Sequence, residues 1–213
     1  MKAEFWHNKW ASGDIGFHLN ETNPRLITHF NKLKLNRGSR LFLPLCGKTN
    51  DIAWLVDSGY HVIGVELSEI AIKALFNELG IMPDITKKGD FYHFSAKNID
   101  IYVGDFFKLS RDVIGTVDAV FDRAALVALP KPLRVDYYRH LAKISQLAPQ
   151  LLITFEYDQL LMSGPPFSIT TQELNTYYQS SYTINAIETV TIEGGFKGKV
   201  PATESVWLLE KAT

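Results

Sequence analysis

Short apolar runs alternate with helical patterns along this chain, and that alternation restricts the fold more than any other feature. Residues 40–43 and 61–65 are short apolar runs, and the segments that follow them, 50–58 and 68–79, carry apolar residues at helical spacing. Strands that alternate with helices are typical of a mostly parallel sheet covered by helices. The sequence therefore predicts an α/β fold.

The rest of the chain continues this pattern. Apolar runs at 117–121 and 150–156 flank a predicted helix at 131–147. Strands that follow each other without a helix can pair as antiparallel hairpins. No repeat, low-complexity segment or linker marks a domain boundary. We predict one domain over residues 1–213, a three-layer sandwich around a mostly parallel sheet of about seven strands. The remaining β-rich segments are 91–94, 99–103, 182–192 and 205–210.

Charge and cysteine content exclude several classes of function. Lys and Arg number 22 against 23 Asp and Glu, so the net charge of -1 gives no general attraction to nucleic acid or anionic membranes. The single cysteine, Cys46, cannot form an intrachain disulfide, and the six histidines lack zinc-like spacing. No apolar run approaches the ~20 residues of a membrane span. We expect a cytoplasmic, metal-free monomer that acts on a small molecule.

The turn after the first predicted strand is the first place to look for a ligand, because α/β sheets bind ligands beyond the carboxyl ends of their strands. This turn, residues 43–49, contains only Gly47. It therefore lacks the glycine pattern of dinucleotide-binding folds. Phe42 stands where a phosphate loop ending in Gly-Lys-Thr needs its first glycine. A nicotinamide or nucleoside triphosphate ligand is disfavoured.

Glu66 ends the second predicted strand, 19 residues after Gly47. Nucleoside-binding α/β folds place a carboxylate here, where its two oxygens accept both ribose hydroxyls. A ribose-binding carboxylate without a phosphate-binding loop favours a nucleoside that lacks phosphates, such as S-adenosylmethionine. The alternative is a surface glutamate that is favourable only because it lies near a helix start.

Other polar residues follow the next strands. Asp105 comes after the strand at 99–103 and is suitably placed to contact an adenine amine, with Phe106 as a stacking wall or as part of the core. Arg123 follows the strand at 117–121, where its donor fork can contact a carboxylate or an electron-rich substrate atom. A local ion pair with Asp122 is the alternative for this arginine.

The N-terminal segment is rich in aromatic residues and interrupted by glycines, so we do not expect a regular core element there. Trp6, Trp10 and Phe17 are suited to a lid, residues 1–23, that closes over an apolar ligand and excludes water. A tail packed against the sheet is the alternative. Cys46 is not expected to be a nucleophile, because no histidine is near it in sequence.

These same segments resemble the thiopurine S-methyltransferase family in its shorter, bacterial form. The similarity spans nearly the whole chain, and the PLCGK turn followed by GVELS is the most specific part of it. Between 175 and 203 the match is loose, so positions that contact the acceptor cannot be transferred there. The matching motifs are FWHNKWASGDIGFH at 5–18, LFLPLCGKTNDIAWLVDSGYHVIGVELSEIAI at 41–72, IYVGDFFKL at 101–109, FDRAALVALP at 121–130 and SGPPF at 163–167.

The resemblance implies a class I, Rossmann-like methyltransferase that uses S-adenosylmethionine and releases S-adenosylhomocysteine. Phe17 matches a position near the acceptor, and Arg123 contacts either acceptor or cofactor. Transfer to a soft nucleophile neutralises charge, so no acid or base is assigned. Thiopurines and other aromatic or heterocyclic thiols are the expected acceptors; selenium or tellurium compounds, halides and aliphatic thiols are alternatives, and a silent nucleoside-binding module is the non-enzyme alternative. The implied cofactor contacts are Trp10, Leu45, Glu66 and Arg123, with Trp6, Asp105 and Phe106.

Overall fold

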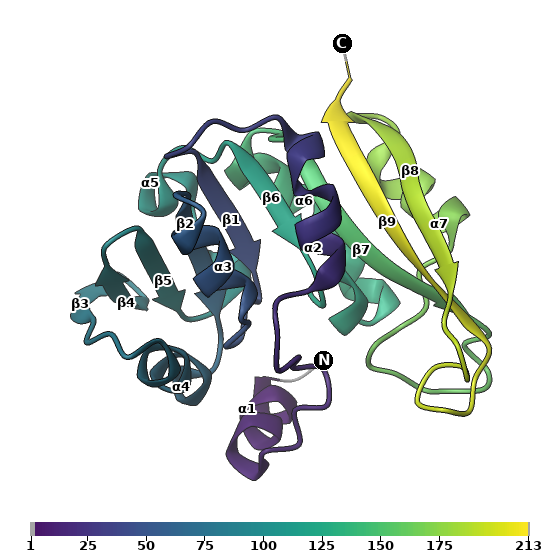
Figure 1. The fold of residues 1–213 in the computed structure, drawn as a ribbon, viewed down its shortest axis with the longest axis horizontal. Helices are drawn as coiled ribbons and strands as arrows, with labels where there is room; N and C mark the ends of the chain where they lie inside the picture. The colour runs from purple at the N-terminus through teal and green to yellow at the C-terminus, as the bar shows by residue number, and fades with distance from the viewer. Residues whose placement is uncertain (1–2, 213) are drawn as a thin grey trace.

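A sheet with helices on both faces makes up the structure (Figure 1). The computed structural model describes residues 3–212. In this range nine strands join in the order β3-β4-β5-β2-β1-β6-β7-β9-β8. The strands are β1 (Arg40–Pro44), β2 (His61–Glu66), β3 (Asp84–Lys88), β4 (Phe91–Ala96), β5 (Ile99–Val103), β6 (Ala119–Asp122), β7 (Gln150–Tyr157), β8 (Tyr182–Thr191) and β9 (Ala202–Lys211).

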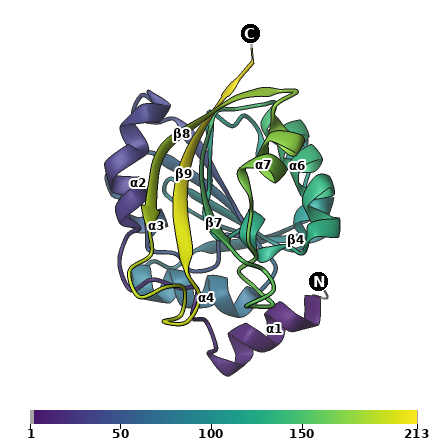
Figure 2. The same cartoon turned by 90° about the vertical axis from the view of Figure 1, so that its right-hand side faces the viewer.

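The helices divide between the two faces, as Figure 2 shows in a view along the sheet. Side chains of α2, α3 and α4 pack with the strands in one core cluster, and those of α5, α6 and α7 pack in the other. The expected three-layer sandwich is confirmed. The helices are α1 (Ala3–Ser12), α2 (Pro24–His29), α3 (Asp51–Asp57), α4 (Glu69–Leu79), α5 (Arg111–Ile114), α6 (Lys131–Ser145) and α7 (Thr171–Tyr178), with short 3₁₀ turns at Phe30–Leu33, Phe106–Lys108 and Leu126–Ala128.

The parallel part of the sheet is its centre. Strands β5, β2, β1, β6 and β7 are parallel, whereas β3 and β4 at one edge and β9 at the other pair in the antiparallel sense. Strand β8 in turn pairs antiparallel with β9. The central strands are buried on both faces, which explains their nearly continuous apolar sequences.

The count of about seven strands was too low, because β3 carries no hydrophobic pattern. All five of its residues are exposed, so no apolar alternation distinguishes it from a loop. It pairs with β4 only and forms one edge of the sheet. Two lysines, Lys87 and Lys88, lie on this edge and discourage pairing with another chain.

The sequence analysis did not predict a helix in the N-terminal segment, but residues 3–12 form helix α1. This helix buries Trp10 alone, so it lacks the broad apolar face that predicts a core helix. Gly13 then takes a left-handed backbone conformation, with φ of 71°, and the chain leaves the helix. None of the helices in residues 3–212 is long and apolar enough to span a membrane.

Strand order places the ligand crevice between β1 and β6. From β1 the chain moves outward through β2 to β5, and β6 then starts on the other side of β1 and leads to β7. Where the direction reverses, the connections after adjacent strands diverge and leave a gap beyond the carboxyl ends. Helix α1 lies at this end of the sheet in Figure 1.

Gly104, directly after β5, gives a test of this packing. A Cβ atom at position 104 would lie 2.5 Å from Phe91 Cδ1, on a ring that is only 3% exposed. We predict that Gly104→Ala lowers the free energy of unfolding by about 1–3 kcal/mol, measured by urea denaturation. Gly16→Ala is the matched control, because a Cβ there meets no atom within 4 Å. Equal stability of the two variants would contradict the packing described.

Candidate active site

A cavity of about 1160 Å³ lies beyond the carboxyl ends of the central strands. Its lining includes the segments after β1, β2 and β5 on one side of the crevice, and residues of α2, β7 and β9 on the other. Small-molecule sites commonly occupy about 300–1,000 Å³, so this cavity has room for a nucleoside and a small second ligand. All the site residues expected from sequence line it: Trp6, Trp10, Phe17, Leu45, Glu66, Asp105, Phe106 and Arg123.

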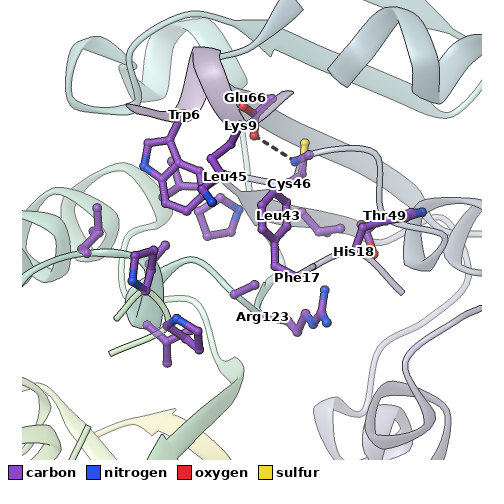
Figure 3. A pocket seen from close by; sticks show the side chains of 18 of the residues that line it. Trp6, Lys9, Phe17, His18, Leu43, Leu45, Cys46, Thr49, Glu66 and Arg123 are labelled. Carbon is purple, nitrogen blue, oxygen red and sulfur yellow. Dashed lines mark hydrogen bonds between the residues drawn. The ribbon is translucent and has the colours of Figure 1, made fainter. Parts of the chain in front are cut away.

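Glu66 holds the turn after β1 to the start of α4. Its Oε2 accepts the backbone N–H of Gly47 at 2.9 Å, the dashed line in Figure 3. Its Oε1 accepts the backbone N–H of Ser68, also at 2.9 Å. The residue is 6% exposed, and burial raises the pKa of its carboxyl, while hydrogen bonds from Ser68, Gly47 and Leu67 oppose this shift. A surface glutamate is therefore excluded. Each oxygen of the Glu66 carboxylate can still accept a second hydrogen bond, because these bonds use one of its two lone pairs.

The turn after β1 takes an unusual backbone conformation. Leu45 has φ of 47° and Gly47 has φ of 54°, both in the left-handed region. A Cβ at position 47 would lie 3.0 Å from Trp10 Cζ2, so the indole ring lies directly against this glycine. The turn and the Trp10 ring that packs on it thus line the same part of the cavity.

Aromatic rings join the N-terminal segment into one cluster. The Phe17 ring meets the Trp6 ring at 5.6 Å and the Trp10 ring at 5.4 Å between centroids, both edge to face. The cluster and the Trp10–Gly47 contact place α1 over the cavity rather than against the sheet.

Asp105 and Phe106 lie together but in different environments. Asp105 is exposed, and its Oδ1 accepts the backbone N–H of Phe107 at 3.0 Å, which caps the following 3₁₀ turn. Phe106 is 3% exposed and packs at 4.9 Å from the Tyr137 ring. The phenylalanine is therefore mainly a core residue with one edge at the cavity.

Arg123 does not pair with its neighbour Asp122. The Asp122 carboxylate instead accepts Tyr137 Oη–H at 2.6 Å and the Leu126 N–H at 3.1 Å. Burial lowers the pKa of the Arg123 guanidinium, and the nearby carboxylates of Asp51 and Glu204 oppose this. Within residues 3–212, no carboxylate forms an ion pair with Arg123. A partly desolvated cation therefore lines the cavity.

The far side of the cavity contains residues that sequence reasoning did not select. Arg25 lines it from α2 and donates to Glu204 of β9 at 3.1 Å and to Glu188 of β8 at 3.0 Å. These partners are more than 160 residues apart in the chain, and no local motif signals their pairing. Apolar side chains that line the same side are Phe155, Pro165, Pro166 and Phe196.

Two residues of the β1 turn have structural roles. Burial and the Glu66 carboxylate raise the pKa of the Cys46 thiol, so it is a poor nucleophile, as expected. Lys48 binds Glu78 of α4 rather than pointing to a phosphate site.

Within the described part of the chain, no three potential metal-ligating side chains come together.

The fold matches that of solved methyltransferases. Burkholderia thailandensis 1,6-didemethyltoxoflavin-N1-methyltransferase, solved with S-adenosylhomocysteine, aligns with a TM-score of 0.65 at 14% identity, over 98% of this chain and 87% of that one. A S-adenosylmethionine-dependent methyltransferase from Anabaena variabilis aligns with a TM-score of 0.66 at 14% identity, over 98% and 95%. The fold of this chain is therefore that of the class I methyltransferases.

Sequence comparison gives the family. The family model described as thiopurine S-methyltransferase matches residues 1–211. The thiopurine S-methyltransferase of Xanthobacter autotrophicus (strain Py2) is 51% identical over 213 residues, which cover 100% of both chains. This chain belongs to the thiopurine S-methyltransferase family.

Glu66 gives a test of the nucleoside side of the cavity. We predict that Glu66→Gln weakens S-adenosylhomocysteine binding about 10- to 100-fold, because one charged acceptor for a hydroxyl is lost. Isothermal titration calorimetry measures the affinity. The control is Glu69→Gln, which removes a partly exposed carboxylate that pairs only with Lys73 on the surface of α4. Unchanged affinity in the Glu66 variant would overturn this assignment.

Asp122 gives a test based on pH. Burial raises the pKa of its carboxyl from 3.8 to about 6. The folded state thus binds this proton more tightly than the unfolded state, so stability falls as pH rises from about 4 to about 6, by at most about 3 kcal/mol. We predict that Asp122→Asn removes this fall, measured by urea denaturation across that range. Parallel pH curves for both proteins would contradict the prediction.

Proposed function

We propose that this chain transfers a methyl group from S-adenosylmethionine to a thiol carried by an aromatic or heterocyclic ring, thiopurines included. The observation that carries the proposal is the pairing of two environments in one cavity. One side presents the buried Glu66 carboxylate, and the other presents apolar side chains with the Arg123 cation. The first fits a nucleoside and the second fits a ring with a negatively charged sulfur.

The donor side of the cavity is built to hold a nucleoside. The two carboxylate oxygens of Glu66 are fixed by backbone donors and match two vicinal ribose hydroxyls. The turn at Leu45 and Gly47 lies beside the methionine part, under Trp10. Asp105 accepts from the adenine amine, with Phe106 at the ring. S-adenosylmethionine supplies a methyl group on a positively charged sulfur.

The acceptor side selects flat, soft nucleophiles. Phe17, Pro165 and Phe155 provide apolar surface for a ring. Arg123 lines the same cavity without an ion-pair partner among the described residues, so an anionic sulfur compensates its charge. A guanidinium close to a thiol also favours the thiolate form. Arg123 thereby holds the acceptor in its reactive state.

The protein contributes mainly alignment and exclusion of water. Transfer to a thiolate neutralises both the sulfonium and the thiolate, so the transition state carries less charge than the reactants. Water stabilises the separated charges most, and a closed cavity removes that stabilisation. The lid expected at residues 1–23 includes residues 1–2, which lie outside the described part of the chain. Residues 3–23 close the site, and the Trp6, Trp10 and Phe17 cluster is the underside of this lid.

We also propose that the enzyme works as a cytoplasmic monomer and binds no nucleic acid. The residues proposed to bind the donor and the acceptor line one cavity of this chain. The lone cysteine agrees with a reducing compartment, and a net charge of -1 gives no attraction to polyanions. Analytical ultracentrifugation at the concentration used in the assay measures the mass of the particle and so tests whether the protein is a monomer.

A panel of acceptors tests the activity. We predict that S-adenosylhomocysteine forms fastest with aromatic and heterocyclic thiols, and that Arg123→Ala lowers kcat/KM for these thiols by about 10-fold or more. Selenite, tellurite, an alkyl thiol and iodide complete the panel. Fastest turnover of iodide or of an inorganic chalcogen would overturn the acceptor class. Binding of S-adenosylhomocysteine without turnover of any acceptor would indicate a silent binding module.

A further inference from the structure

His18 is a titratable side chain of the cavity that has no role in the proposed function. It lines the cavity directly after Phe17 (Figure 3). Within residues 3–212, no hydrogen bond joins its imidazole to another protein group, although its backbone N–H donates to Ile15 O at 2.8 Å. Its ring nitrogens are therefore available to a ligand.

The backbone on both sides holds His18 in place. Phe17 before it packs between the Trp6 and Trp10 rings. Leu19 after it accepts a hydrogen bond from Asn50 Nδ2 at 3.1 Å, at the start of α3. The backbone at His18 is thus anchored on both sides rather than carried on a loose tail.

The buried and half-buried carboxylates that line the same cavity are already engaged. Glu66 accepts two backbone N–H groups, and Glu204 accepts Arg25. Asp51 Oδ1 accepts the Asn23 N–H at 2.7 Å, and its Oδ2 accepts the Thr49 hydroxyl at 2.8 Å. Among these groups, only an imidazole has an ordinary pKa near neutral pH.

We propose that His18 is the base that takes the proton from acceptors that enter the cavity as neutral thiols. This inference rests on the proposed function and extends it from thiolates to thiols of high pKa. Ionised acceptors need no base. Arg123 favours the thiolate, and His18 removes the proton that a weakly acidic thiol still carries.

The charges around His18 keep it neutral and able to accept a proton. Burial is the largest cause that lowers its pKa below 6.5, and Lys48 and Arg123 lower it further. Glu78 and Asp51 oppose them. A base must be unprotonated to act, so His18 is competent above its lowered pKa and is lost as pH falls through it.

The step balances without a further reactant. The thiol S–H proton moves to the unprotonated ring nitrogen of His18, and the sulfur electron pair forms the new S–CH₃ bond. The donor's CH₃–S bond breaks, and its electron pair returns to the donor sulfur. The imidazolium then releases its proton to water.

Two acceptors that differ in ionisation at neutral pH test the proposal. A nitro-substituted thiophenol is ionised, and an alkyl thiol is almost fully protonated. We predict that His18→Gln lowers kcat/KM for the alkyl thiol about 100-fold and leaves the nitrothiophenol nearly unchanged. The pH profile adds a second readout. In the wild type kcat/KM for the alkyl thiol reaches a plateau above the His18 pKa, whereas in the variant it rises in proportion to the thiolate.

Controls keep the test interpretable. S-adenosylhomocysteine affinity by calorimetry reports whether the variant site is intact, and His7→Gln removes an exposed histidine of α1 that does not line the cavity. Equal losses for both thiols, or no loss for either, would overturn the role of His18. If the wild type methylates neither thiol, the proposed function itself fails.

Discussion

The buried Glu66 carboxylate is the interaction on which the site depends. Two backbone N–H groups, from Gly47 and Ser68, bind its two oxygens and so join the turn after β1 to the start of α4. A buried charge without such partners would cost several kcal/mol. Because the hydrogen bond from Gly47 to Glu66 fixes the position of Gly47, it also fixes the surface against which Trp10 packs. Helix α1 is thereby tied to the sheet through one carboxylate.

Charge is distributed unevenly over the cavity. The Glu66 carboxylate is fixed by backbone amides, and Arg25 is paired, whereas Arg123 has no ion-pair partner within residues 3–212. The Arg123 guanidinium and the imidazole of His18 face a partly apolar space. Such an arrangement favours an acceptor that brings the negative charge itself or gives up a proton on binding. This agrees with the proposed methyl transfer, in which the positive sulfonium of the donor and the negative thiolate of the acceptor are both neutralised.

Sequence reasoning succeeded where signals are local. The strand–turn–strand order placed Gly47 and Glu66 at the same edge of the sheet, and the helix expected at 68–79 is α4, which Ser68 caps. It missed β3, whose residues are all exposed, and the helical form of α1, which has no broad apolar face. The Arg25–Glu204 pair was also missed, because tertiary packing alone brings α2 and β9 together.

The central claim is that Glu66 binds the ribose of the methyl donor. A crystal structure of the protein with S-adenosylhomocysteine tests it most directly. We predict that both ribose hydroxyls lie within about 3 Å of the two Glu66 oxygens, with Trp10 over the homocysteine part. A ribose bound by another group, or a nucleoside bound away from the β1 turn, would contradict it.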